Sequence, residues 1–245
     1  MSLLRCLRIV LVPAMLGGLG CLAAPGSALA STNTAAPAIA APAIGTPNAA
    51  TPDAVAVASP RQRITVTASS YGTTYATVRV YQLSGSSTTK WVQVMGPWTA
   101  RVGRNGVARP GAKREGDGKT PSGTYGFSFF FGVDANPGTH FSYRHAYAYD
   151  YWDDDPSSPL YNEWVDTRTQ NAGRAPEPMH NVPAYNYAAV IAYNTARTPG
   201  LGSAIFLHVG TGGPTAGCVS LPVADLLKIL RWLNPNAHPT ITIAG

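Results

Sequence analysis

Short segments in which apolar and polar residues alternate run through the chain after about residue 61 and indicate β-strands. The segments are 64–67, 76–81, 91–95 and 98–102. A Gly96-Pro97 turn is expected to separate the last two segments. Because no helical pattern lies between the segments, the sequence predicts a meander of short strands and not a series of βαβ units.

Two later segments are apolar almost throughout, which is typical of buried strands. They cover 188–193 and 205–208. A Gly/Pro/Thr-rich loop then leads to Cys218, and apolar residues recur at helical spacing from Val223 to Leu233. We expect a helix there, beginning near Pro222, and a last strand at 240–243. These patterns predict a mainly β domain with one short helix after the cysteine.

The first 30 residues have the pattern of a secretory signal peptide. Arg5 and Arg8 precede an apolar core, and small residues end the segment at Ala30. We therefore expect cleavage after Ala30 and an exported protein of the cell envelope, the periplasm or the cell exterior. A lipoprotein signal, with Cys21 as the lipidated residue, is the weaker alternative.

A second segment, residues 31–60, is rich in Ala, Pro and Thr and contains no aromatic residue. Such a composition provides nothing to bury in a core, so this segment is predicted to be a disordered linker. The folded domain is expected to cover residues 61–245.

The charge of the chain excludes some classes of partner. The formal net charge is +6 at pH 7, and removal of Arg5 and Arg8 with the signal peptide leaves 16 basic against 12 acidic residues. No block of Lys and Arg of the kind that binds nucleic acid is present. A mild positive charge suits an anionic polymer of the cell surface. No membrane contact is expected beyond the signal peptide.

Two common kinds of site fail on residue spacing. Gly118-Lys119-Thr120 resembles the end of a phosphate-binding loop, but Lys113 stands where that motif needs a glycine. The histidines outside the 205–222 stretch show no metal-ligand spacing with a cysteine. They are His140, His145, His180 and His238. No metal and no cofactor is therefore expected.

Cys218 and His208 are the candidate catalytic residues. Cys218 is the one cysteine left after the predicted cleavage, so an internal disulfide is excluded. A thiol acts as a nucleophile in its thiolate form, and a nearby imidazole is a common way to produce the thiolate. The loop between the two residues is long enough to bring imidazole to sulfur. The alternatives are an inert buried cysteine and a core histidine.

A long irregular segment at 136–181 is rich in aromatic residues. A loop of this length inside a compact domain is usually a lid or a binding loop. Four of its residues, and one threonine before the cysteine, are candidates for substrate binding. They are Trp152, Tyr161, Asn162, Trp164 and Thr215. The alternative is that the rings belong to the core.

Three parts of the chain together resemble the catalytic domain of L,D-transpeptidases (YkuD-like). They are the glycine-rich turn at 118–125, the apolar strand that ends in His208, and Thr215-Ala216-Gly217-Cys218-Val219. The resemblance covers about residues 61–245 and implies a β-sandwich of mixed sheets, with Cys218 as nucleophile and His208 as base. The family often has Ser-His-Gly-Cys where this chain has Thr215-Ala216-Gly217-Cys218, and it often has arginine where Ser220 stands.

The resemblance also implies an activity, the cross-linking of bacterial peptidoglycan. Cys218 would attack the L,D bond of a stem tetrapeptide and form a thioester, which an amine of another stem peptide would resolve. Backbone N–H groups of Gly217 and Cys218 are the expected oxyanion donors, because glycine lets a substrate approach the chain closely.

Two other functions stay open from the sequence. If water resolves the thioester, the protein is an L,D-carboxypeptidase or a related hydrolase. If the cysteine is inert, the protein is a non-catalytic module that binds the cell wall. Carbapenems acylate the cysteine of the family that the chain resembles, so a carbapenem is an expected covalent inhibitor if the protein is a transpeptidase or a carboxypeptidase.

Deletion of residues 31–59 is expected to leave the folding and the in-vitro activity of the domain unchanged, because a segment of this composition cannot supply a core. Thermal unfolding of the mature protein with and without the segment tests this. A fall of several degrees in the melting temperature of the shortened protein would contradict the linker assignment.

Overall fold

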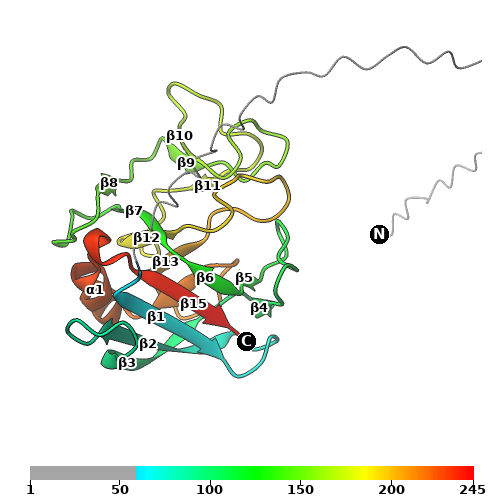
Figure 1. Cartoon of the computed structure of the whole chain (residues 1–245). Helices are drawn as coiled ribbons and strands as arrows, with labels where there is room; N and C mark the ends of the chain where they lie inside the picture. The colour runs from blue at the N-terminus through cyan, green and yellow to red at the C-terminus, as the bar shows by residue number, and fades with distance from the viewer. Residues whose placement is uncertain (1–58) are drawn as a thin grey trace, which may run out of the picture. The chain divides into compact units, whose positions relative to one another are not determined.

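Residues 59–245 are described by the computed structural model shown in Figure 1. The predicted signal peptide, 1–30, and the predicted linker up to residue 58 lie outside the described residues, so both assignments stay predictions. In the described part of the chain, no helix has the length and the hydrophobicity needed to cross a membrane.

Ten strands form one mixed sheet. In order across the sheet they are β6 (Gly123–Tyr125), β15 (Thr240–Ala244), β1 (Gln62–Ala68), β2 (Tyr75–Leu83), β3 (Trp91–Arg101), β14 (Val219–Leu221), β13 (Phe206–Val209), β12 (Ala188–Ile191), β7 (Phe127–Gly132) and β8 (Tyr143–His145). The pairs β1–β15, β13–β14 and β7–β8 are parallel, and the other pairs are antiparallel.

Smaller elements complete the described domain. They are a sheet of β10 (Trp164–Asp166), β9 (Asp150–Trp152) and β11 (Glu177–Pro178), a pair of β4 (Val107–Ala108) and β5 (Thr120–Pro121), the helix α1 (Val223–Trp232) and the 3-10 helix η1 (Pro235–Ala237). The mainly β fold with mixed sheets and one short helix after the cysteine is confirmed.

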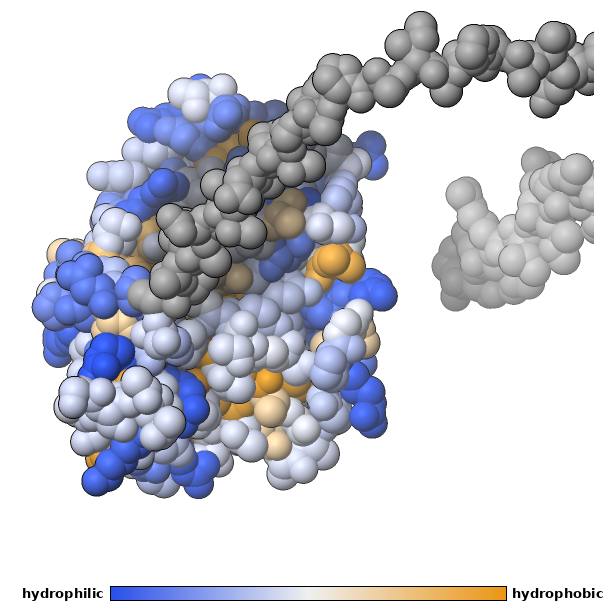
Figure 2. All heavy atoms as spheres, in the orientation of Figure 1, coloured by the Kyte–Doolittle hydropathy of each residue, from blue (hydrophilic) through white to orange (hydrophobic). Residues whose placement is uncertain are grey.

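The large sheet curls, so that strands from both of its ends contribute to one core (Figure 1). Ile64 of β1, Phe130 of β7 and Ile241 of β15 belong to this core and are fully buried. On the face shown in Figure 2, apolar residues are scattered in small groups among polar ones. This is expected where the apolar half of each alternating strand points inward.

The helix α1 closes the core with one apolar side. Leu226, Ile229 and Leu230 are buried at a helical spacing that places them on one face, and Leu233 continues this face beyond the helix end. Asp225 in the first turn is favourable near the positive end of the helix dipole. The helix therefore forms where the sequence predicts it, because its apolar stripe matches the inner face of the sheet.

The expected turn at Gly96-Pro97 is wrong, because both residues lie inside β3. The pairing of β3 with β2 is irregular there, with register shifts around Val80. Gly96 has φ +80°, and a Cβ atom on it would lie 2.6 Å from the carbonyl oxygen of Val78. Glycine thus permits a kink within one long strand, and the dipeptide that reads as a turn is an irregularity in the sheet.

The aromatic segment at 136–181 is not a structureless loop. It contains β8, which is a strand of the large sheet, and β9, β10 and β11. Its later part, with Trp152 and Met179, packs in a second cluster that is separate from the core around α1. Strand alternation separates the two faces: Phe130 joins the core around α1, whereas Phe131 joins the second cluster with Trp152 and Phe206. The alternative, that the rings of this segment are core residues, holds for Trp152, which is 5% exposed.

Replacement of Leu230 by alanine in α1 is expected to lower the free energy of unfolding by about 2–5 kcal/mol, because the change leaves a cavity among fully buried side chains. Val223→Ala at the exposed start of the same helix is the matched control, with an expected change of within about 0.5 kcal/mol. Denaturant unfolding measures both. Equal losses in the two variants would contradict this account of the core.

Candidate active site

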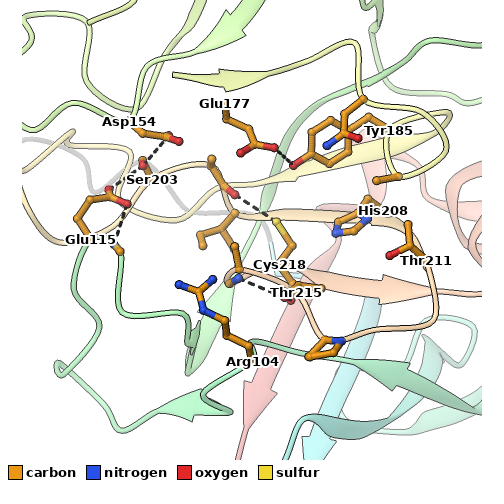
Figure 3. A pocket seen from close by; sticks show the side chains of 18 of the residues that line it. Arg104, Glu115, Asp154, Glu177, Tyr185, Ser203, His208, Thr211, Thr215 and Cys218 are labelled. Atoms are coloured by element: carbon orange, nitrogen blue, oxygen red, sulfur yellow. Dashed lines mark hydrogen bonds between the residues drawn. The ribbon is translucent and has the colours of Figure 1, made fainter. Parts of the chain in front are cut away.

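Cys218 and His208 line the same cavity, which has a volume of about 360 Å³. Figure 3 shows the His208 ring beside the Cys218 side chain. The volume lies in the lower part of the range found for small-molecule sites. The structure thus brings together the two residues that the sequence predicts as nucleophile and base.

The pairing of β13 with β14 places both side chains. These strands are parallel, with Leu207 opposite Val219 and His208 opposite Ser220. Leu207 and Val219 point into the core around α1, so the next residues along each strand point to the opposite face. Cys218 directly precedes Val219 and lies in the second cluster, on the side where the cavity opens.

The loop before the cysteine is held by two threonine hydroxyl groups. Thr120 and Thr215 both donate hydrogen bonds to the carbonyl oxygen of Cys218, at 3.1 and 2.7 Å. The hydroxyl oxygen of Thr120 accepts a bond from the N–H of Gly103. Thr215, a predicted substrate-binding residue, lines the cavity and orients the cysteine. Thr120 is part of the glycine-rich turn that the sequence analysis noted but did not connect with the cysteine.

Gly217 lacks the space for a side chain. A Cβ atom there would lie 3.2 Å from the carbonyl oxygen of Lys119 and 3.3 Å from a methyl group of Ile205. The N–H of Gly217 donates to the hydroxyl oxygen of Thr215 at 3.1 Å. Of the two expected oxyanion donors, the N–H of Gly217 is therefore bound to Thr215 of its own loop. Cys218 lies directly before β14, which begins at Val219.

The tautomer of His208 is set by the backbone. Nδ1 lies 2.8 Å from the carbonyl oxygen of Val209, and because a carbonyl oxygen only accepts, Nδ1 carries the proton. The lone pair of Nε2 is then free to take a proton. Tyr185 packs against the imidazole with its ring edge-on, at 5.4 Å between centroids. Burial lowers the pKa of His208 to about 4, so the ring is neutral near pH 7.

The thiol of Cys218 is also neutral in the free protein. Its Sγ atom donates to the carbonyl oxygen of Ala204 at 3.2 Å and accepts from the N–H of Phe206 at 3.3 Å. Burial raises the pKa of Cys218 to about 12, and the charges of Glu177 and Asp154 add to this rise. The sequence-based expectation of a thiolate favoured by imidazole is thus not met in the free protein, because both groups are removed from water.

One side of the cavity is acidic. Ser203 Oγ lies 2.7 Å from Glu115 Oε2 and 2.8 Å from Asp154 Oδ1. A hydroxyl group has one proton to donate, so the second contact is a hydrogen bond only when a carboxyl group donates to Ser203. Burial, with the charges of Glu115 and Glu177, raises the pKa of Asp154 to about 7. Asp154 therefore holds a proton through part of the neutral range.

Glu177 is the third carboxylate of this side. It accepts a hydrogen bond from the hydroxyl group of Tyr185 at 3.0 Å, as Figure 3 shows. Burial raises the pKa of Glu177 as well. Tyr185 thus connects the acidic side with His208, against which its ring packs.

Comparison with known proteins gives one result for the folded part of the chain. The family model described as "L,D-transpeptidase catalytic domain", YkuD, matches residues 74–243. The chain belongs to the YkuD family. The search of curated proteins and the search of solved structures found no match.

The four aromatic-segment residues predicted to bind substrate in this YkuD domain do not line the cavity of Cys218. Trp152 donates to Asn162, and Trp164 donates to Asp150, each through its indole N–H. Tyr161 donates to Glu115 and is 2% exposed. The two tryptophan rings pack against Phe131 and Phe206, and Tyr161 reaches the cavity only through its bond to Glu115, so these residues support the wall of the cavity.

Sequence reasoning missed the charged side chains of the cavity of this YkuD domain. The aromatic segment contributes Asp154 and Glu177 in place of the expected rings, and the turn before Gly116 and Gly118 contributes Glu115. No spacing connects these three residues along the chain. A possible signal was the high local density of polar residues beside the rings in the aromatic segment.

Among residues 59–245 of the YkuD domain, no group of three or more His, Cys, Asp and Glu side chains is arranged to hold a metal ion. The cavity itself is lined by a thiol, an imidazole and carboxyl groups, among other side chains. A thiol and a neutral imidazole in one cavity can perform nucleophilic attack with removal of the thiol proton.

His208 is expected to make the folded protein less stable as the pH falls from about 6.5 to 4. Its pKa in the folded protein is about 4, against an ordinary value of 6.5, so the unfolded chain takes up a proton in this range before the folded one does. The pKa is depressed, and the stabilisation is therefore complete above pH 6.5 and lost as the pH falls through 4. The shift corresponds to about 3 kcal/mol.

Denaturant unfolding of the wild type and of His208→Gln at pH 7 and pH 4 measures this loss. The wild type should lose up to about 3 kcal/mol more than the variant between these pH values. Asp154 shifts in the opposite direction but is common to both proteins, so its effect cancels in the difference. Identical pH dependence of the two proteins would show that His208 is not buried as a neutral ring.

Proposed function

We propose that this chain is an exported cysteine acyltransferase that cross-links peptidoglycan by cleaving the L,D bond of a stem tetrapeptide. The observation that carries the proposal is the placement of Cys218 and His208 in one cavity of a YkuD-family domain. Export rests on the signal-peptide pattern of residues 1–30 alone.

In the first half of the reaction, Cys218 Sγ attacks the carbonyl carbon of the L,D bond. His208 Nε2 takes the thiol proton during the attack, because both groups are neutral beforehand. The C–N bond breaks, His208 passes the proton to the leaving nitrogen, and the terminal D-amino acid departs. The stem peptide stays on the enzyme as a thioester.

The negative charge on the carbonyl oxygen needs hydrogen-bond donors during the attack. The N–H of Cys218 is the donor that we assign, since this residue lies before the β14 ladder begins at Val219. The N–H of Gly217 is the second donor only if it leaves the hydroxyl group of Thr215, to which it is bound at 3.1 Å.

In the second half, an amine of another stem peptide attacks the thioester and restores the thiol. The acidic side of the cavity, with Glu115, Asp154 and Glu177, attracts a cationic ammonium group to this place. The amine must lose a proton before it attacks, and His208 is the neutral base in the cavity. Water in place of the amine gives the runner-up function, an L,D-carboxypeptidase.

Incubation of the mature domain with disaccharide tetrapeptide, followed by mass spectrometry, tests the proposal. A cross-linked dimer with loss of one D-amino acid supports the transpeptidase, and a tripeptide alone supports the carboxypeptidase. Cys218→Ala and His208→Ala should each reduce the product by a similar large factor, about 10³-fold or more, because members of one nucleophile–base unit are not additive.

The other histidines supply matched controls. Gln variants of His140, His145, His180 and His238 should each keep most of the activity, since none of them lines the cavity. A carbapenem should add one mass adduct to the wild type and none to Cys218→Ala. An active His208→Ala protein beside a dead variant at another histidine would refute the assignment of the base, and an unreactive wild type would favour the wall-binding module.

A further inference from the structure

The cavity of Cys218 has a basic residue whose charge nothing in the described part of the chain neutralises. Arg104 and Lys113 are the two basic residues among its lining residues. The ammonium group of Lys113 is occupied, because it pairs with Asp117 at 2.8 Å and donates to the carbonyl oxygen of Arg114 at 2.6 Å. The side chain of Arg104 takes part in none of the hydrogen bonds and ion pairs formed among residues 59–245.

The backbone of Arg104 is tied to the loop that carries the nucleophile. Its N–H donates to the carbonyl oxygen of Thr215 at 2.7 Å, and Gly103 and Thr215 form a β-bridge. The N–H of Thr215 in turn donates to the carbonyl oxygen of Val102 at 2.9 Å. These bonds fix the base of the arginine side chain relative to Cys218, three residues further along the loop.

The positive charge of Arg104 and the carboxyl groups lie on different parts of the cavity wall. Figure 3 shows the Arg104 guanidinium below the space between Glu115 and Cys218. Glu115, Asp154 and Glu177 lie on other parts of the wall. A ligand carboxylate is repelled by this acidic side and attracted to Arg104, whose planar guanidinium can donate two parallel hydrogen bonds to it.

We propose that Arg104 binds the terminal carboxylate of the residue that leaves, and so restricts the reaction to an L,D bond followed by a single C-terminal amino acid. The inference rests on the proposed function, which supplies the bond that Cys218 attacks. In a stem tetrapeptide this carboxylate belongs to the residue directly after the scissile carbonyl, so it lies within about 4 Å of the reacting carbon.

The acylation step then balances as follows. The bond between Sγ and the carbonyl carbon forms, and the bond between this carbon and the leaving nitrogen breaks. The thiol proton passes through His208 to the leaving amine. The amino acid departs with its carboxylate still ionised, and Arg104 becomes free again. When the peptide continues beyond this residue, an amide takes the place of the carboxylate and the charge of Arg104 stays unpaired.

The test compares two synthetic stem peptides that differ only in a terminal carboxylate or a terminal carboxamide. Thioester formation on Cys218 is followed by mass spectrometry under single-turnover conditions at low peptide concentration. We expect the wild type to prefer the carboxylate peptide by about 10- to 100-fold in the second-order rate constant, the usual strength of a charge-assisted pair. Arg104→Gln should bring this preference close to one, and Arg104→Lys should keep part of it.

Arg109→Gln is the matched control, because Arg109 is an exposed arginine nearby that stacks on Tyr71 and does not line the cavity. This variant should keep the wild-type preference. A preference that survives in Arg104→Gln, or a wild type that reacts equally with both peptides, would overturn the role of Arg104 and leave the proposed function intact. A wild type that forms a thioester with neither peptide would overturn the proposed function and this inference with it.

Discussion

The parallel pairing of β13 with β14 is the constraint on which the site depends. Leu207 and Val219 face each other across this pair and are fully buried in the core around α1. Their burial fixes the face on which His208 and Cys218 must lie, since the side chains of a strand alternate between its two faces. A slip of one residue in this register would turn the imidazole into the core and Leu207 into the cavity. The core therefore specifies the geometry of the site, although no catalytic side chain belongs to it.

The second constraint is the low exposure of the reacting groups. Burial favours the uncharged form of both the thiol and the imidazole, so the free protein holds a neutral pair and avoids the cost of a buried ion pair. In the proposed reaction, charge then appears during the attack, when the substrate carbonyl and its oxyanion donors are present. The acidic side follows the same rule, because a shared proton on Asp154 reduces the charge among Glu115, Ser203 and Asp154. The cavity is thus uncharged at Cys218 and His208, and its charged side chains lie on other parts of the wall, where a ligand can be held.

Much of the fold can be predicted from the sequence, because apolar residues repeat at a regular spacing in the alternating strands and in the one amphipathic helix. The Gly96-Pro97 dipeptide led to the wrong prediction of a turn inside β3, since only the pairing with β2 shows that the strand continues through it. The placement of Cys218 and His208 in one cavity could be predicted because the two residues lie close in the sequence, on either side of one loop. Glu115, Asp154 and Glu177 could not, because Glu115 comes from an earlier turn and the other two from separate parts of the aromatic segment, and the three meet only in the folded chain. The strands β9 and β10 have three residues each, too few to show which face Trp152 and Trp164 take.

The departures at Ala216 and Ser220 have a physical basis in the neighbouring strands. Ala216 lies on the exposed rim of the cavity, so a histidine there would be solvated, whereas His208 already has its tautomer set by the carbonyl group of Val209. Ser220 is 2% exposed and lies opposite Arg101 of β3. The Arg101 guanidinium stacks on Tyr75 at 3.8 Å.

An arginine at position 220 would place a second positive charge opposite Arg101, at a strand position where the side chain is buried. Two like charges there would repel each other, and the new, buried charge would lose hydration; either effect costs free energy. Serine avoids this cost, although its hydroxyl group is buried without a hydrogen-bond partner among the described residues. The residue two positions after the cysteine is therefore coupled to the residue on β3, because Ser220 and Arg101 lie opposite each other.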